Sequence, residues 1–259
     1  MLLRRDDRGV LAIGQLSHSW ISGQLARAWG NARFGEVAPL EDVILGAQQH
    51  DLGMSAWDLA PPRNPETGLP VSFTEMPLEV SLEQWRDGPR RLLSQSRYAA
   101  LLASMHGYKL YGRHNLEAAP PVQATAIRAY LNEQRAFQAE LVQALRGDPA
   151  AAKFASEETV DRNSRLVWAW DLLSLMLILD WAPRDPDPVP TSGGECRLEL
   201  VPTGEPGRFR LAPWPLREGV VTVRCEGRRL KRSYDTDPAL SQALAAAPWE
   251  TLEFVLERE

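Results

Sequence analysis

The chain has little cysteine and no long hydrophobic run. Its only cysteines, Cys196 and Cys225, form no C-x-x-C pair, which argues against a disulfide framework and against a structural zinc knuckle. No stretch approaches the roughly 18 uninterrupted apolar residues of a membrane span, and the first residues lack the apolar run of a signal peptide. We therefore expect a cytoplasmic protein with reduced thiols and no membrane partner.

An excess of basic charge is also absent. The formal net charge is −5, so nucleic acid is not an expected partner, although a local basic patch can still attract phosphate groups. Hydrophobic residues make up 44% of the 259 residues, which is enough to fill the core of one large domain.

Apolar periodicity predicts helices over most of the first 181 residues. After a short extended pair at residues 1–15, one helix fits residues 16–30 and a second fits residues 39–53, with acidic residues in its first turn. Further helices are expected at 79–86, 89–114, 122–147 and 157–181, and Pro183 ends the last of them. The proline-rich stretch 55–77 has no period and is interpreted as a pocket wall, a lid or a surface excursion.

A different pattern begins after the proline-rich linker at residues 182–194. Alternating polar and apolar residues with intervening turn residues predict short strands at 196–202, 207–216, 219–230 and 251–259. The sequence therefore predicts a mainly α fold class. A helical domain would cover residues 1–183, and a small β-rich C-terminal appendage would cover residues 192–259.

Several polar residues lie on helical stripes that are otherwise apolar. They are His18, His50, Asp51 and Asp171. An unpaired carboxylate at the position of Asp171 would cost several kcal/mol, so it needs a positive partner. An arginine such as Arg27 or Arg165 is one solution, and a bound divalent cation is the other.

These four residues together favour the cation. A His-Asp dipeptide alone arises often by chance, but two imidazoles and two carboxylates from three helices form a recognisable ligand set. Such a set suits iron, manganese, cobalt, nickel or zinc and leaves positions for water. The sequence therefore predicts a divalent transition-metal site made by His18, His50, Asp51 and Asp171.

The segments around these residues resemble the HD superfamily of metal-dependent phosphohydrolases. That pattern has a histidine on one helix, a His-Asp pair ending a second helix and an aspartate on a much later helix, here "LSHSWISGQLA", "QQHDLGM" and "VWAWDLLS". The likeness covers about residues 10–182 and is strongest to an uncharacterised bacterial family of HD-like proteins in which "HSW", "HD" and a proline-rich segment with "TGLP" occur in this order. The resemblance implies an HD-like helical domain.

Two positions depart from the superfamily pattern. Many HD hydrolases have a lysine after the glycine of the second element, where this chain has Met54. Some carry a glutamate a few residues later as a general acid or base, and Asp58 is the nearest carboxylate here. We assign Asp51 and Asp58 as candidate catalytic residues on this basis.

The ligand set favours hydrolysis of a phosphoester, because a bound cation supplies hydroxide and polarises a phosphoryl oxygen. His106, Lys109 and Arg113 fall on one helical face. His106 is a candidate catalytic residue, as a second-metal ligand or a phosphate contact, and the two cations are candidate contacts to a small phosphorylated molecule. The alternative is a solvated basic face. Trp57 could stack on a nucleotide base or simply pack in the core.

Two other functions remain open. A di-iron oxygenase usually needs two further histidines, but His106 and His114 would lie about 12 Å apart on one helix. The second is a non-catalytic HD-like module that senses a ligand or binds a partner through the β-rich region. Loss of the lysine and glutamate favours such a module, whereas retention of all four ligands argues against it.

Overall fold

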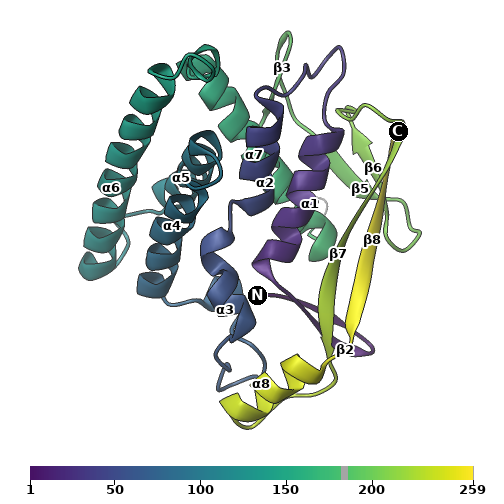
Figure 1. Ribbon diagram of the computed structural model, residues 1–259. Helices are drawn as coiled ribbons and strands as arrows, with labels where there is room; N and C mark the ends of the chain where they lie inside the picture. Colours follow the sequence, from purple (N-terminus) through teal and green to yellow (C-terminus); the bar gives the residue numbers. More distant parts are fainter. Residues whose placement is uncertain (182–185, 259) are drawn as a thin grey trace.

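The computed structural model describes residues 1–181 and 186–258, and its helices gather on one side of an extended sheet (Figure 1). Serine caps set the start of two long helices: the Ser96 hydroxyl accepts from the Ala99 amide at 3.0 Å, and the Ser156 hydroxyl accepts from the Thr159 amide at 3.2 Å. The helices are α1 (Gln15–Ala28), α2 (Leu40–Gln49), η1 (Leu52–Met54), α3 (Ser55–Leu59), η2 (Phe73–Glu75), α4 (Leu78–Leu92), α5 (Arg97–Gly112), α6 (Pro121–Arg146), η3 (Ala152–Phe154), α7 (Glu157–Ile178) and α8 (Asp237–Ala246).

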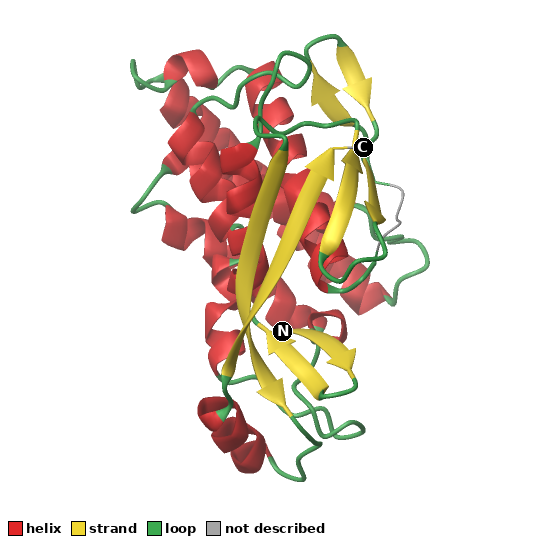
Figure 2. Cartoon of the chain, turned by 90° about the vertical axis from the view of Figure 1, so that its right-hand side faces the viewer, coloured by secondary structure: helices red, strands yellow, loops and turns green. Residues whose placement is uncertain are grey.

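The strands form one large sheet and a small hairpin. The large sheet has the order β1-β2-β7-β8-β6-β5; its described pairs are antiparallel apart from β6 and β8, which are parallel. Figure 2 shows the two long strands crossing in front of the helices. The strands are β1 (Leu2–Asp6), β2 (Gly9–Ile13), β5 (Glu199–Pro202), β6 (Arg208–Ala212), β7 (Val220–Leu230) and β8 (Trp249–Arg258), with β3 (Val189–Thr191) and β4 (Gly194–Cys196) as the hairpin.

The sheet corrects the predicted fold class. The described chain is about 50% helix and 20% strand, so a mainly α fold with a small β-rich appendage is wrong. Strand β2 of the N-terminal pair joins the C-terminal strands through Val10 opposite Leu230. Val223 and Phe254 of the sheet belong to the same hydrophobic core as Trp170 of α7. Local alternation predicts strands, but it carries no information about pairing between residues so distant in sequence.

The local elements agree better with their predictions. The N-terminal extended pair is confirmed as β1 and β2, and helices are confirmed over most of residues 16–30, 39–53 and 157–181. Pro183, the predicted end of the last helix, lies outside the described residues. The domain boundaries at 183 and 192 stay predictions. No helix within the described residues has the length and apolarity to cross a membrane.

A glycine allows α1 and α2 to pack closely. A Cβ at Gly23 would lie 2.7 Å from the Cβ of Gln48, so a larger residue would force the helices apart. Gln48 lies beside the end of α2, where His50 follows as the C-cap residue. Close packing here brings the end of α2 towards the face of α1 that carries His18.

Candidate metal centre

His18 is held by a hydrogen bond that selects one of its ring nitrogens. The imidazole is 2% exposed, and its Nδ1 lies 2.8 Å from the Ser174 hydroxyl. That hydroxyl donates to the carbonyl of Asp171 at 2.7 Å, so it accepts from Nδ1–H of His18. The Nε2 atom then faces Oδ2 of Asp51 at 2.5 Å with its lone pair. Two acceptors this close need a positive charge between them, from a proton or a metal ion.

His50 shows the same arrangement at the end of α2. Its Nδ1–H donates to the carbonyl of Ala47 at 2.8 Å. The other ring nitrogen, Nε2, is buried and has no hydrogen-bond partner among the described residues. It lies 3.4 Å from Oδ2 of Asp51 and 3.3 Å from Oδ1 of Asp171. A buried imidazole nitrogen aimed at two carboxylates is what a metal ligand presents.

Asp171 enters the cluster from α7. Its Oδ1 lies 3.3 Å from Nε2 of His50, and its Oδ2 lies 3.7 Å from Nε2 of His106. The arginine pairing considered from the sequence does not explain it. Arg165 contacts Glu195 at 2.7 Å instead, and Arg27 lies in the last turn of α1, about 13 Å along that helix from His18. The ion-pair contacts of Asp171 among the described residues are with the imidazoles of His18, His50 and His106.

His106 completes the group from α5. Its ring lies between two indoles, with centroids 5.5 Å from Trp85 and 5.1 Å from Trp168. Its Nδ1 is buried without a hydrogen-bond partner among the described residues. Burial, followed by the positive field of His50, lowers the pKa of His106 to about 4. A neutral imidazole with a free lone pair is the form that binds metal.

We call His18, His50, Asp51, His106 and Asp171 the His/Asp centre. Burial alone lowers the pKa of His50, but the carboxylates of Asp51 and Asp171 outweigh it and raise that pKa to about 9. Burial raises the pKa of Asp51, yet His50 and His18 reverse the effect and hold it well below its usual range. The carboxylates are therefore ionised and attract positive charge.

The donor atoms fit a transition metal. Ligand atoms of His18, His50 and Asp51 lie within 4.8 Å of one another, as do those of His50, His106 and Asp171. Both triads combine imidazole nitrogen with carboxylate oxygen, a combination suited to iron, manganese, cobalt, nickel or zinc. Because the two oxygens of Asp171 face different histidines, the His/Asp centre has donors for one ion or for two.

Asp58 makes its contacts at the start of α1. Its Oδ2 accepts a short hydrogen bond from the backbone amide of Gln15, and its Oδ1 lies 3.5 Å from the amino nitrogen of Met1. A Cβ at Gly14 would lie 3.0 Å from the same carboxylate. Burial, the largest influence, raises the pKa of Asp58. These contacts are those of a helix-capping side chain.

The other predicted substrate contacts lie in two places. Trp57 is half-buried in α3, and its indole nitrogen has no hydrogen-bond partner among the described residues. Lys109 and Arg113 both lie over the ring of Trp168, at 4.6 and 4.7 Å from its centroid. Trp168 contacts His106, so the two cations are connected to the His/Asp centre through one aromatic ring.

Several residues that lie near the His/Asp centre were not among those predicted from the sequence. Ser174 orients His18 and could have been found, because it lies three residues after Asp171 on the same helical face. Trp85 and Asp187 had no such signal, since their positions depend on how α4 and the segment after α7 pack. His114 stacks on Tyr111 with a centroid separation of 5.1 Å.

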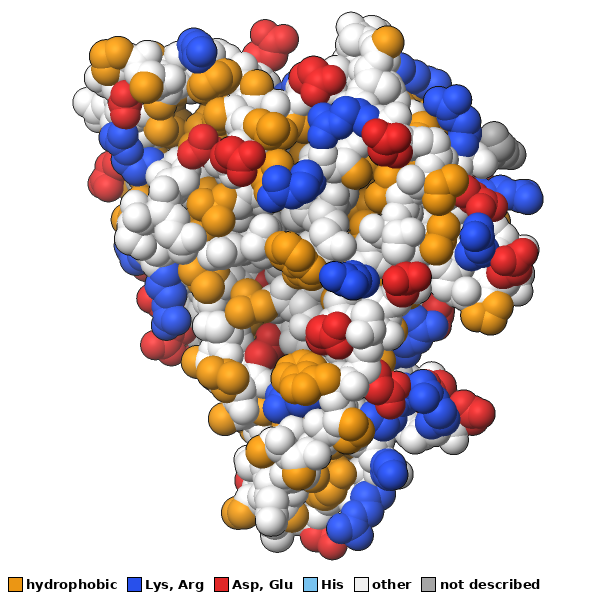
Figure 3. Space-filling view, turned by 45° about the vertical axis from the view of Figure 1, so that its right-hand side comes forward, with side chains coloured by type: hydrophobic (Ala, Val, Ile, Leu, Met, Phe, Trp, Pro, Cys, Tyr) orange, Lys and Arg blue, Asp and Glu red, His pale blue; other side chains and the backbone are white. Residues whose placement is uncertain are grey.

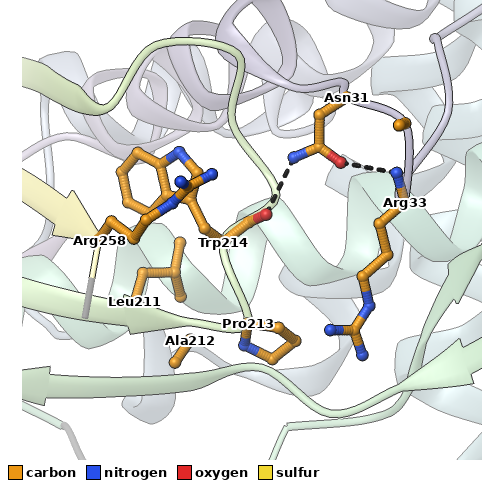
Figure 4. A pocket seen from close by; sticks show the side chains of 8 residues that line it. Asn31, Arg33, Leu211, Ala212, Pro213, Trp214 and Arg258 are labelled. Atoms are coloured by element: carbon orange, nitrogen blue, oxygen red, sulfur yellow. Dashed lines mark hydrogen bonds between the residues drawn. The ribbon is translucent and has the colours of Figure 1, made fainter.

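A separate cavity of about 480 Å³ lies between the segment after α1 and strand β6. Figure 4 shows Arg33 and Arg258 on either side of its apolar floor. The side-chain amide of Asn31 donates a hydrogen bond to the carbonyl of Trp214. None of the site residues predicted from the sequence lines it.

Figure 3 shows acidic and basic side chains interspersed over one face of the molecule.

Comparison with known proteins identifies a family but no activity. Residues 1–232 match the model of a family described as "Protein of unknown function (DUF3891)". Neither the curated proteins nor the solved structures contain a match to the chain.

Proposed function

The chain belongs to the DUF3891 family, and we propose from its own site that it is a metal-dependent phosphohydrolase acting on a small phosphoester, with nucleotides among the candidate substrates. The metal would be a divalent transition ion, namely iron, manganese, cobalt, nickel or zinc. The ligands would be His18, His50, Asp51 and Asp171, with His106 available to a second ion.

One observation carries the proposal. In His18 and in His50 a hydrogen bond fixes the proton on Nδ1 and leaves Nε2 facing carboxylate oxygen. Structural histidines usually use both ring nitrogens in hydrogen bonds when buried. Here Nε2 of His50 has no such partner among the described residues, and a bound metal ion would supply one.

The order of the ligands supports the same reaction class. A histidine on α1, a His-Asp pair after α2 and an aspartate on α7 follow the order found in HD phosphohydrolases, which the sequence resembles. The resemblance covers about residues 10–182, so strands β5 to β8 lie outside it. Likeness of arrangement alone does not establish activity, so the proposal depends on the chemistry of the site.

Each side chain of the centre would have its own role in this reaction. When bound, a divalent cation provides hydroxide at neutral pH and draws charge from a phosphoryl oxygen. Asp51 and Asp171 remain ionised and offset the positive charge. Ser174 and the carbonyl of Ala47 keep the imidazoles in one tautomer. Asp58 has no assigned step, because its carboxylate is engaged at the start of α1.

Metal analysis tests the proposal first. Protein purified without chelator should contain about one or two transition-metal ions per chain by elemental analysis. The Asp51→Ala and Asp171→Ala variants should lose the metal while remaining folded. Asp161→Ala provides the matched control, because this α7 carboxylate is 61% exposed and outside the His/Asp centre. A parent protein that stays metal-free after reconstitution contradicts the proposal and leaves a non-catalytic binding module.

Activity is tested on the reconstituted protein. p-Nitrophenyl phosphate, its diester and a panel of nucleotides should be assayed with each candidate metal. Hydrolysis that disappears in Asp171→Ala but persists in Asp161→Ala supports a phosphohydrolase. The second triad, which includes His106, makes two ions a specific outcome to measure. Two irons per chain with oxygen consumption and no hydrolysis would favour the oxygenase instead.

A further inference from the structure

Two cations on α5 converge on a single carboxylate beside the His/Asp centre. Nζ of Lys109 lies 3.1 Å from Oδ2 of Asp187, and the guanidinium of Arg113 makes a short contact with the same oxygen. Both cations also rest on the ring of Trp168. One ammonium, one guanidinium and an aromatic surface therefore enclose a site that an oxyanion now fills.

This group lies one helical turn from the proposed metal ligands on two helices. Lys109 follows His106 by three residues on α5, and Trp168 precedes Asp171 by three residues on α7, a rise of about 4.5 Å in each case. The rings of Trp168 and His106 are 5.1 Å apart. The side chain of Asp171 is 13% exposed, more than any other member of the centre. Asp171, the most exposed member of the centre, is thus also the member one turn from Trp168 on α7.

Hydrogen bonds to the residues before and after Asp187 fix the position of its backbone. Arg197 donates to the carbonyl of Pro186 at 2.8 Å, and Arg165 donates to the carbonyl of Pro188 at 3.0 Å. These bonds tie the backbone on either side of Asp187 to Arg197 and to Arg165 of α7, and the carboxylate of Asp187 reaches the two cations. Asp187 itself is about one-third exposed, so it can leave without unpacking the core.

The charges do not balance within the group. Two cations share one carboxylate, and the neighbouring Arg165 is paired with Glu195. An oxyanion with more charge than a carboxylate, such as a phosphate, would satisfy the ammonium and the guanidinium better. Burial, the largest influence, lowers the pKa of Lys109, whereas Asp187 opposes it. The cation thus gains from keeping an anionic partner.

We propose that Lys109, Arg113 and Trp168 form a second anion subsite of the active centre and that Asp187 occupies it until a substrate displaces it. The inference rests on the proposed function and deepens it. The substrate would be a phosphoester carrying a further oxyanion about one helical turn from the phosphoryl group at the His/Asp centre. Asp187 acts as an internal competitor, which lowers affinity for substrates that lack the second anion.

Direct binding of inorganic phosphate tests the subsite without using hydrolysis. The probe is titrated calorimetrically into chelator-treated protein, so that metal does not contribute a phosphate site. We expect Asp187→Asn to bind phosphate about five- to tenfold more tightly than the parent, because two partly exposed ion pairs oppose binding in the parent. The double variant Asp187→Asn/Arg113→Gln should lose that gain. A parallel titration with acetate identifies whether the subsite prefers phosphate or carboxylate.

Asp161→Asn is the matched control, because it removes a carboxylate that lies on α7 and 4.0 Å from Arg165. It should leave phosphate affinity unchanged. Equal affinity in the parent and Asp187→Asn overturns the inference, as does a gain that survives loss of Arg113. A protein without metal and without hydrolytic activity would contradict the proposed function, but it would leave the measured phosphate binding unaffected. Hydrolysis with no effect of Asp187→Asn would remove the inference alone.

Discussion

The sheet and the helical layer each contain a cluster of ionisable side chains, and the two clusters balance their charges differently. In the sheet, Arg229 donates to both carboxylate oxygens of Glu250 at 3.0 and 2.9 Å and to Asp6 at 2.7 Å. In the helical layer, the His/Asp centre leaves Nε2 of His50 without a hydrogen-bond partner among the described residues. The first cluster is complete within the chain, whereas the second needs protons or a cation.

This difference distinguishes a structural ion pair from a candidate metal-binding site. The guanidinium of Arg229 is matched in shape and charge by carboxylates on β8 and β1. Its hydrogen bonds with Glu250, above all, hold its pKa above the usual value. The imidazoles of His18 and His50 are instead oriented by neutral groups, the Ser174 hydroxyl and the Ala47 carbonyl. Such contacts fix direction without supplying charge, so the positive charge beside the carboxylates comes from a proton on His50 or from a bound cation.

The largest expected effect comes from breaking the helical cluster. Asp51→Asn preserves shape but removes the negative charge that faces His18 and His50. Metal should be lost, and hydrolysis should fall by at least about a thousandfold, since the bound ion contributes several kcal/mol to the transition state. Elemental analysis and initial rates check both results. A variant that kept its full metal content would show that Asp51 is not a ligand.

Breaking the sheet cluster should affect stability without affecting metal. Arg229→Met removes a guanidinium whose side chain is 5% exposed, while its partners are partly exposed. We expect the free energy of unfolding to fall by about 1–2 kcal/mol, because solvent screens the partly exposed carboxylates. Urea unfolding should give the same decrease with and without chelator. A decrease that depended on chelator would mean that the two clusters are coupled.

Ser174→Ala tests orientation in the helical cluster. The variant leaves all five members of the His/Asp centre in place but removes the acceptor for Nδ1–H of His18. Metal affinity should fall about tenfold, in the range observed when an outer partner of a metal ligand is lost. Competition with a chromogenic chelator measures it. Ser164→Ala, another buried serine on α7, should bind metal as the parent does.

The helical cluster could be predicted because its polar residues interrupt apolar stripes. His18 and Asp171 had to be explained, since each lies where a helix faces the core. The role of Asp58 could not be found in this way, because closeness to the His-Asp pair in sequence does not place its carboxylate among the imidazoles. Its contact with the Gln15 amide depends on how α3 packs against α1.

The sheet was harder to predict than the helices. Alternation identified the strands, but the pairing of residues 10–12 with residues 228–230 joins segments more than 200 residues apart in the chain. Neither end contains a signal for that register. The ion pairs of Arg229 depend on the same register, because Asp6 and Glu250 come from different strands. Arg229 therefore could not be distinguished from a surface arginine in the sequence.

The smallest predicted effect sharpens the contrast between the interior and the edge of the β structure. Burial raises the pKa of the Cys225 thiol on β7 to about 12, so at pH 8 it stays protonated and unreactive. Cys196, on the small hairpin, is only half-buried. A thiol-specific chromogenic reagent should modify Cys225 at least about tenfold more slowly than Cys196 in the native protein. The Cys196→Ala and Cys225→Ala variants assign the two phases. Equal rates would mean that the Cys225 thiol is not shielded in the core, because burial is the largest influence on its pKa.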